Sequence, residues 1–361
     1  MRKNRMFPAI VGASITALAL ASCASGTPEA GGESEERPYE GVELVVTSFG
    51  GDWEAALIAG VVEPFEAATG AEVTLVTAYS ADALAQITAQ AGNPQYDVVH
   101  FSGGQELVAA QNDLILPIEA SALSTYDELQ PLAVEGMADG YGPVIQVTPV
   151  GLVYNSEKVT EAPTSWTDVL DPAYAGHVAL TDFSNTYGVL SMLRVNDALG
   201  SSIDDVTEGL TALGNLAASG DAIVVASSAD LQAAFAQRDI WLAPYAQDYA
   251  ETLRQAGLPV EFVIPEEGIT ASFITANVVA GRENPELAEM FIDFSLKAEA
   301  QQVFAELMRY APVNTTVELS DDVAGSVLAA DQFDTIERYD SQKIADNRQT
   351  WTDDWNSRIS Q

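Results

Sequence analysis

Short apolar runs alternate with amphipathic segments along most of this chain, and that alternation predicts an α/β fold. Leu44–Val46 and Val73–Val76 are runs rich in β-branched residues with the length of buried strands. Between them lies a segment whose apolar residues recur at helical spacing, namely Trp53, Leu57, Val61, Phe65 and Ala68. Gly70 stands where a helix C-cap is expected, and Pro64 is expected to divide this helix into two pieces.

The loop before this helix carries the first candidate chemistry. Gly50 and Gly51 allow a sharp turn in which the backbone approaches a ligand closely. Asp52 occupies the position expected of an N-cap. The sequence therefore predicts a strand, a glycine loop and a helix N-terminus, a geometry that suits a small polar ligand and especially an anionic group.

The same alternation continues to the C-terminus. Further strands are expected at residues 96–101, 144–155, 178–182, 222–226, 240–243, 260–264 and 273–279. Helices are expected at 81–91, 106–111, 186–199, from a cap at Ser227–Asp230 through Phe235, at 285–308 as the longest, and at 344–359. This order favours mainly parallel sheets flanked by helices.

Ligands of such sheets lie beyond the carboxyl ends of the strands. Four loops there are polar and built of small residues: 48–51, 102–104, 182–185 and 227–228. We expect them to share one cleft, with carboxylates and aromatic rings from neighbouring positions. The candidate ligand-binding residues on or beside these loops are Ser48, Phe49, Gly50, Gly51, Asp52, Ser102, Gly103, Asp182, Phe183, Ser184 and Asn185, and a family resemblance given below adds Tyr245, Asp248, Ser272, Phe273 and Tyr310.

Length and charge narrow the functional classes. The 361 residues exceed what one hydrophobic core usually serves, so two lobes are expected. The 53 acidic residues against 15 basic ones give a net charge of -38, which repels phosphate backbones and excludes a nucleic-acid role. The excess negative charge fits either attraction of cationic solutes or solubility in a salty habitat.

The N-terminus predicts export and lipid attachment. Arg2, Lys3 and Arg5 precede an apolar stretch at 7–20, the pattern of a signal peptide that is too short to span a bilayer comfortably. The stretch ends in Leu20-Ala21-Ser22-Cys23, which resembles a bacterial lipobox, and Cys23 is the only cysteine. Residues 1–22 are therefore expected to be removed, and 23–40 to form a lipidated, flexible tether on the extracytoplasmic face of the cell membrane.

Ordered motifs over residues 42–358 resemble the solute-binding proteins of ABC importers, in the branch of spermidine/putrescine and opine binders. They are the lipobox, Gly50-Gly51-Asp52-Trp53, Pro64-Phe65-Glu66, Thr69-Gly70, Tyr96-Asp97-Val98-Val99, Gly151-Leu152-Val153-Tyr154-Asn155, Pro163-Thr164-Ser165-Trp166, Asp171-Pro172-Ala173-Tyr174-Ala175-Gly176, Leu180-Thr181-Asp182, Tyr310-Ala311-Pro312-Val313-Asn314 and Trp351-Thr352-Asp353-Asp354-Trp355.

The resemblance implies a two-lobed type II periplasmic-binding-protein fold, each lobe a mainly parallel sheet flanked by helices, with the ligand cleft between them. Lobe 1 is expected at 41–147 plus 272–310 and lobe 2 at 148–271 plus 311–361. The resemblance also implies a monomer that closes on a small polar solute, polyamine- or opine-like or derived from an amino acid. The partners would be an ABC permease and its ATPase, and no cofactor is expected.

The chain departs from the polyamine binders at the residues that pair with amines. Carboxylates of that branch correspond to Phe183 and Thr186, and a Trp-x-Asp pair corresponds to Ser272 and Ile274. A tryptophan of that branch corresponds to Ala246. The carboxylates left to face a cleft are Asp52, Asp182 and Asp248, so a spermidine-specific site is not indicated.

Two other functions are weighed against solute transport. A ferric-ion carrier of related fold would use adjacent tyrosines, but the chain has no Tyr-Tyr pair, and His100 and His177 lack ligand spacing. A secreted hydrolase is disfavoured because no Gly-x-Ser-x-Gly or His-Glu-x-x-His motif is present, which leaves only a carboxylate-based glycan hydrolase open. We therefore expect a binding protein rather than an enzyme.

Overall fold

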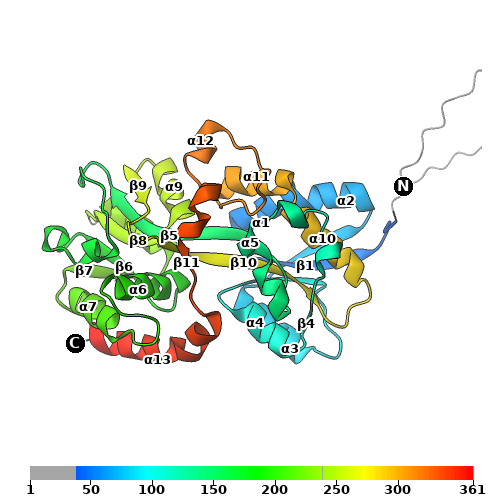
Figure 1. Ribbon diagram of the computed structural model, residues 1–361, viewed down its shortest axis with the longest axis horizontal. Coiled ribbons are helices and arrows are strands. Elements are labelled where there is room, and N and C mark those ends of the chain that lie inside the picture. The colour runs from blue at the N-terminus through cyan, green and yellow to red at the C-terminus, as the bar shows by residue number, and fades with distance from the viewer. Residues whose placement is uncertain (1–37, 238, 361) are drawn as a thin grey trace, which may run out of the picture. The chain divides into compact units, whose positions relative to one another are not determined.

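The computed structural model describes residues 38–237 and 239–360 (Figure 1). The predicted signal peptide, Cys23 and most of the predicted tether lie outside the described residues. Among the described residues, no helix combines the length and the apolar character that a membrane span requires.

Helices and strands alternate through the described chain. The strands are β1 (Glu43–Ser48), β2 (Glu72–Thr77), β3 (Val98–Ser102), β4 (Ile115–Leu116), β5 (Val144–Asn155), β6 (Val178–Thr181), β7 (Ala222–Val225), β8 (Leu242–Ala246), β9 (Val260–Val263), β10 (Ile269–Val279) and β11 (Ile336–Glu337). The α-helices are α1 (Gly51–Leu57), α2 (Glu63–Thr69), α3 (Ser80–Ala89), α4 (Gln105–Gln111), α5 (Pro131–Val134), α6 (Thr186–Ala198), α7 (Thr207–Ala218), α8 (Ser228–Gln237), α9 (Gln247–Gln255), α10 (Pro285–Leu296), α11 (Ala298–Met308), α12 (Asp321–Ala324) and α13 (Ser341–Ile359).

The strands form one mixed sheet in the order β2-β1-β3-β10-β5-β8-β6-β7. The outer groups are parallel, with β1 beside β2 and β3 at one end and β6 beside β7 and β8 at the other. Strands β5 and β10 pair antiparallel in the middle and extend between the two groups (Figure 1). The expected α/β fold, mainly parallel within each group, is confirmed.

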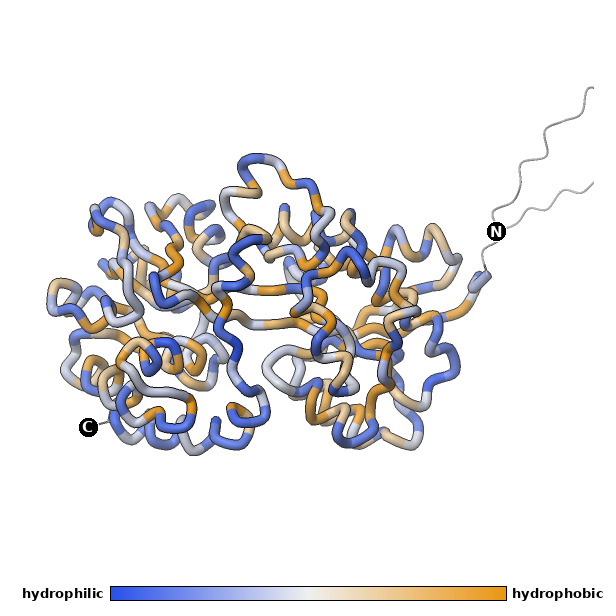
Figure 2. Tube along the Cα trace, viewed as in Figure 1, coloured by the Kyte–Doolittle hydropathy of each residue, from blue (hydrophilic) through white to orange (hydrophobic). Residues whose placement is uncertain are grey.

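Each parallel group is covered by helices on both faces. In Figure 1, α1 and α11 lie above the strands at the N-terminal end of the sheet, and α3 and α4 lie below them. At the other end, α9 lies above the strands, and α6, α7 and α13 lie below. Hydrophobic residues run along the middle strands, while the segment leading into α13 is hydrophilic (Figure 2).

The buried side chains form separate clusters at the two ends of the sheet. One large cluster draws on residues 44–147 and 269–333, and another draws on 150–242 and 351–355. Ala311, Val313, Leu328 and Phe333 pack in the first cluster, although the sequence places 311–361 with lobe 2. The chain joins the second cluster again at Tyr339 and α13, through Trp351 and Trp355.

The predicted first unit is confirmed in outline and corrected in detail. Gly70 is the left-handed C-cap of α2, as expected. Asp52 is not the N-cap, because α1 already begins at Gly51 after Gly50, and no side chain caps it. The helix is divided into two α-helical pieces, α1 and α2, as expected: Pro64 lies in the first turn of α2, directly after a π-helical turn at Ile58–Val62.

Later elements also differ where tertiary contacts intervene. The expected long helix at 285–308 is broken at Lys297, whose backbone is extended. The Gln301 side chain donates to the carbonyl oxygens of Ser295 and Ile145, and so satisfies a carbonyl freed at the break. Helices α7 and α9 were not predicted, and the strand expected at 240–243 lies at 242–246.

Candidate functional site

The first glycine loop is held by its own side chains. Ser48 is fully buried; its Oγ accepts a hydrogen bond from the Gly50 amide over 2.9 Å and donates one to Glu54 over 2.6 Å. Gly50 and Gly51 have φ angles of 75° and 56°, so both use the left-handed region that glycine favours. Ser48 therefore shapes the turn.

An aromatic wall stands beside this loop. The ring of Phe49 lies 4.8 Å from that of Trp53 and stacks on Tyr79 at 6.4 Å. Tyr79 is 64% exposed, which is unusual for a tyrosine that has a stacking partner. Asp52 is exposed nearby and caps no amide. The wall therefore offers a rigid apolar surface at the rim of the glycine loop.

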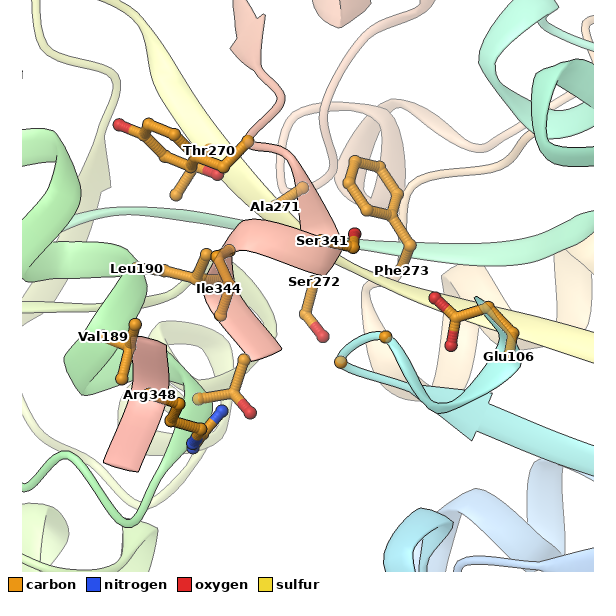
Figure 3. Close-up of a pocket in the computed structure, with 14 residues that line it drawn as sticks. Glu106, Val189, Leu190, Thr270, Ala271, Ser272, Phe273, Ser341, Ile344 and Arg348 are labelled. Carbon is orange, nitrogen blue, oxygen red and sulfur yellow. The ribbon is translucent and has the colours of Figure 1, made fainter. Parts of the chain in front are cut away.

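Gly103, Ser272 and Phe273 line one pocket together, although 169 positions separate Gly103 from Ser272. The pocket has a cavity of about 60 Å³ (Figure 3). Its other lining residues are Gly104, Glu106, Thr186, Val189, Leu190, Thr270, Ala271, Tyr339, Ser341, Ile344 and Arg348. The pocket thus joins the second glycine loop, the start of α6, strand β10 and the start of α13.

Glycine is required where the second loop meets α6. Gly103 has a φ of 86°, and a Cβ built on it would lie 3.7 Å from Oγ1 of Thr186. The Ser102 amide donates to Oγ of Ser80 over 3.0 Å, which fixes the loop from the α3 side. The predicted loops at 102–104 and 182–185 therefore approach each other from opposite ends of the sheet.

A second group of predicted residues converges on Asp248. The Tyr245 ring lies 5.0 Å from that of Tyr187 and 5.2 Å from that of Tyr249. Burial, and after it the Asp248 carboxylate, raise the pKa of both Tyr187 and Tyr310. We call Asp248, Tyr187, Tyr245, Tyr249 and Tyr310 the tyrosine cluster.

Hydrogen bonds fix the cluster from both ends of the sheet. The hydroxyls of Tyr245 and Ser228 are 2.6 Å apart, and the Asn185 side chain bonds to Tyr245 as well. The Tyr310 hydroxyl bonds to Thr148 of strand β5. Of the predicted site residues, the structure thus brings together Asn185, Tyr245, Asp248 and Tyr310.

Asp248 supplies the carboxylate of the tyrosine cluster. Its carboxylate accepts hydrogen bonds from its own amide and from that of Tyr249, but its Oδ1 is shielded from solvent and has no partner. Burial raises the pKa of Asp248 to about 7, because the charged form loses its hydration. A carboxylate with one oxygen shielded from solvent and unpartnered is stabilised by a cation, and tyrosine ring faces also attract cations.

The loop at 182–184 does not offer its side chains to the pocket. Phe183 is 1% exposed and stacks on Trp355 at 4.6 Å, so its ring belongs to the second hydrophobic cluster. Asp182 accepts from the Ser184 amide over 2.9 Å. Partial burial alone would raise the pKa of Asp182, but the hydrogen bonds that it accepts, first from Ser184 and then from Trp355 and Phe183, together lower that pKa. These residues therefore shape the loop.

Glu106 was not predicted, yet it is the most buried acid in the pocket. It is 8% exposed, its Oε2 has no partner, and burial raises its pKa despite hydrogen bonds from its own amide and that of Gly104. It also lines an adjoining cavity of about 500 Å³ with Tyr141 and Arg338. Only its place directly after the second glycine loop could have marked it in the sequence.

Indications in the sequence were weaker for the other site residues that were not predicted. Tyr187 and Tyr249 each lie within two positions of a predicted residue, and Arg348 is one of few basic residues in an acidic chain. The histidines lie elsewhere: His100 is fully buried in the sheet, and His177 stacks on Trp241 at 3.7 Å. Within residues 38–237 and 239–360, no three His, Cys, Asp or Glu side chains are grouped so as to hold a metal ion.

The sequence pattern of bacterial extracellular solute-binding proteins matches residues 60–331. A spermidine/putrescine-binding periplasmic protein of Escherichia coli is 24% identical over 79% of this chain and 83% of its own length. A Salmonella paratyphi A periplasmic protein named for 2-aminoethylphosphonate binding is 24% identical over 74% of this chain and 77% of its own length. An uncharacterized Haemophilus influenzae protein is 25% identical over 62% of this chain, which spans 65% of that protein.

Solved structures share the fold over most of the chain. An ABC transporter protein from Clostridium perfringens superposes with a TM-score of 0.78 at 24% identity, covering 88% of this chain and 99% of that one. A spermidine/putrescine substrate-binding protein from Streptococcus pneumoniae superposes with a TM-score of 0.72 at 18% identity, with the same two coverages. The arrangement of helices and strands is therefore one that periplasmic binding proteins also have.

Proposed function

Because this chain belongs to the bacterial extracellular solute-binding protein family, whose members bind solutes for transport and are not enzymes, we propose that it captures a small amine for an ABC importer. The solute would carry a primary ammonium group, and the chain would deliver it to the permease. Asp248 carries this proposal, since its shielded Oδ1 has no partner and lies among four tyrosines.

The physical argument is one of desolvation. A carboxylate removed from water without a cation is destabilised, and an ammonium ion entering the cluster would restore its ionised form. The tyrosine faces would surround the alkyl chain and attract the charge. Burial raises the pKa of Tyr187, Tyr245 and Tyr310, so these hydroxyls stay neutral and available as hydrogen-bond donors.

Named relatives support an amine. Spermidine, putrescine and 2-aminoethylphosphonate, the solutes in the names of the curated relatives, all carry a primary amino group. The absence of the polyamine branch's carboxylates at Phe183 and Thr186 argues for fewer positive charges on this solute. We infer a solute with one ammonium group at the tyrosine cluster.

We also propose that the two ends of the sheet act as lobes that close on the solute. Strands β5 and β10 would be the hinge, and the change of lobe after Tyr310 would fall near β11. Support comes from the separate hydrophobic clusters and from the pocket that Gly103 and Thr186 line together. Contacts made only in the closed form would shift the equilibrium towards it, and the permease would recognise that form.

Membrane attachment is proposed from the sequence alone. Removal of residues 1–22 would leave Cys23 as the lipid-bearing first residue of a monomer tethered outside the cell membrane. Cys23→Ala should release the protein from the membrane fraction. Unchanged membrane association of that variant would contradict lipidation at Cys23.

The solute is tested by calorimetric titration of the purified protein with putrescine, spermidine, 2-aminoethylphosphonate and n-butylamine. We expect wild-type protein to bind at least one of them, and Asp248→Asn to weaken binding about tenfold or more, or about 1.4 kcal/mol. Asp127→Asn is the matched control, because it removes the same charge from an exposed short helix. Equal affinity of wild type and Asp248→Asn would refute the ammonium site.

A further inference from the structure

We propose that Arg348 binds an anionic group of the solute, so that the solute is a zwitterion with an ammonium at one end and a carboxylate or phosphonate at the other. The ammonium half of this assignment rests on the proposed function. The anionic half rests on Arg348 itself and on the pocket that it lines.

Arg348 lies on α13 and forms one side of the pocket that also holds Gly103 and Ser272 (Figure 3). Its Nη2 donates to the carbonyl oxygens of Phe183 and Ser184, over 3.3 and 3.2 Å. Burial lowers the pKa of Arg348, because the pocket removes part of the hydration of its charge. The guanidinium is therefore anchored to the 182–184 loop, and it forms no ion pair with an Asp or Glu of residues 38–237 and 239–360.

This lack of a carboxylate partner separates Arg348 from the other basic residues. Within the described residues, every other lysine or arginine except Lys297 forms an ion pair with Asp or Glu: Lys158, Arg194, Arg254, Arg282, Arg309, Arg338, Lys343 and Arg358. Lys297 has its ammonium 3.3 Å from the centre of the Phe294 ring. The net charge of -38 means that acidic partners are abundant in this chain, so an arginine that pairs with none of them stands out.

The chemistry of the guanidinium fits an anion. Arginine has five N–H donors in a planar fork that matches carboxylates and phosphonates, and only Nη2 is engaged by the two carbonyls. The Thr186, Ser272 and Ser341 side chains line the same pocket and carry further hydroxyl donors. Glu106 lies across the pocket (Figure 3), and its shielded Oε2 has no partner among the described residues, so it does not neutralise the guanidinium.

The pocket and the tyrosine cluster draw on the same helix start and the same pair of strands. Thr186 lines the pocket, and the next residue, Tyr187, belongs to the cluster. Ser272 lines the pocket, and its partner across the β5–β10 ladder is Thr148, which bonds to Tyr310. Directly opposed residues of an antiparallel pair share a face, so Ser272 in the pocket and Thr148 beside Tyr310 lie on the same face of the sheet.

This arrangement discriminates between solutes. A diamine would place its second ammonium near the Arg348 guanidinium, and like charges in a partly desolvated pocket repel strongly. An ω-amino acid or an aminoalkylphosphonate places opposite charges at the two ends. The acidic surface alone would favour cations, so anion binding requires a local positive charge such as Arg348.

The test compares wild type, Arg348→Gln and Arg358→Gln by calorimetry. The glutamine at 348 retains an N–H donor for the loop carbonyls while removing the charge, and Arg358 is a matched arginine on the same helix that pairs with Asp354. The probes are 4-aminobutyrate, 2-aminoethylphosphonate, putrescine, n-butylamine, n-butyrate and ethylphosphonate. Whichever zwitterion binds more tightly distinguishes a carboxylate from a phosphonate.

We expect Arg348→Gln to bind the zwitterion that wild type prefers about tenfold more weakly or worse. The affinity of Arg348→Gln for n-butylamine should differ from that of wild type by less than about twofold. Arg358→Gln should bind every probe like wild type. The assignment is overturned if Arg348→Gln binds both zwitterions like wild type, or if wild type prefers putrescine to both. If wild type binds the matching amine-free anion through Arg348 but binds no amine, the ammonium proposal fails and the anion assignment stands. Binding of no probe at all overturns both.

Discussion

The indole Nε1 of Trp53 donates a hydrogen bond of 2.8 Å to Oε1 of Gln146, which joins helix α1 to the middle strand β5. Both side chains are buried, and Nε2 of Gln146 has no other partner. Trp53 also contacts the rings of Phe49, His100 and Phe304. This single bond therefore links the first glycine loop to the strand whose Thr148 bonds to Tyr310.

Trp53→Phe should destabilise the protein by about 1–3 kcal/mol, because it leaves a buried amide oxygen without a donor. Denaturant unfolding followed by circular dichroism measures the loss. Trp241→Phe is the control, since its Nε1 bonds to exposed Asp239. Equal stability of Trp53→Phe and wild type would show that water replaces the indole.

Gly188→Ala should destabilise α6 and disturb the site together. A Cβ at residue 188 would lie 2.5 Å from the carbonyl oxygens of both Thr181 and Asp182, a contact that only backbone movement relieves. We expect a loss of about 1–3 kcal/mol and weaker solute binding, because Asn185 and Tyr187 move with the helix start.

Gly214→Ala is the matched helical control for this substitution. Its added Cβ would lie 3.0 Å from Cβ and Cδ of Arg358 and would meet no backbone carbonyl, so we expect a smaller loss of stability than for Gly188→Ala. Thermal unfolding and calorimetry measure both variants. A Gly188→Ala protein with wild-type stability and affinity would show that α6 can shift without cost.

His100 should make the protein less stable in mild acid. It is fully buried, its Nδ1 lies 2.6 Å from the Thr47 carbonyl, and burial lowers its pKa from 6.5 to about 4. The unfolded chain therefore binds a proton between these pH values while the folded chain does not, so stability falls as pH drops from about 6.5 to about 4. Comparing the pH dependence of unfolding for wild type, His100→Gln and the control His177→Gln measures this contribution; identical slopes for all three would contradict it.

Asp248 should have the opposite effect on the pH dependence of stability to that of His100. Burial raises its pKa from 3.8 to about 7, so the folded state holds a proton that the unfolded state has released. The solute-free protein therefore loses stability as pH rises from about 4 to about 7. Asp248→Asn should remove this loss and melt higher than wild type near pH 8, with a smaller difference near pH 4.

Solute binding gives a second measurement of the same group. An ammonium ion at Asp248 favours the ionised carboxylate, so binding to wild type below pH 7 should release protons, and Asp248→Asn should release fewer. Calorimetry in buffers of different ionisation enthalpy counts these protons. Equal proton release by the two proteins would place the titrating group elsewhere.

Local patterns in the sequence determined the elements and much of their order. The β-branched runs at 44–46 and 144–155 are strands, Gly70 ends a helix, and Ser227 and Asp230 cap α8 through reciprocal hydrogen bonds. These features depend on residues that are close together in the sequence, so the sequence alone predicts them. The break at Lys297 depends on Gln301 reaching Ile145, a contact that local periodicity does not encode.

The candidate site was likewise predicted in part from the sequence and decided in part by the tertiary structure. The sequence indicated the glycine loops and Asn185, because small and polar residues after strands can be recognised in it, and the family resemblance added Tyr245, Asp248 and Tyr310. Tertiary packing decided that Phe183 stacks on Trp355, that Ser48 supports its own loop, and that Glu106 and Arg348 line the pocket. A side chain's burial and charge partners are set by residues far along the chain, so only the folded structure shows which charges remain for a solute.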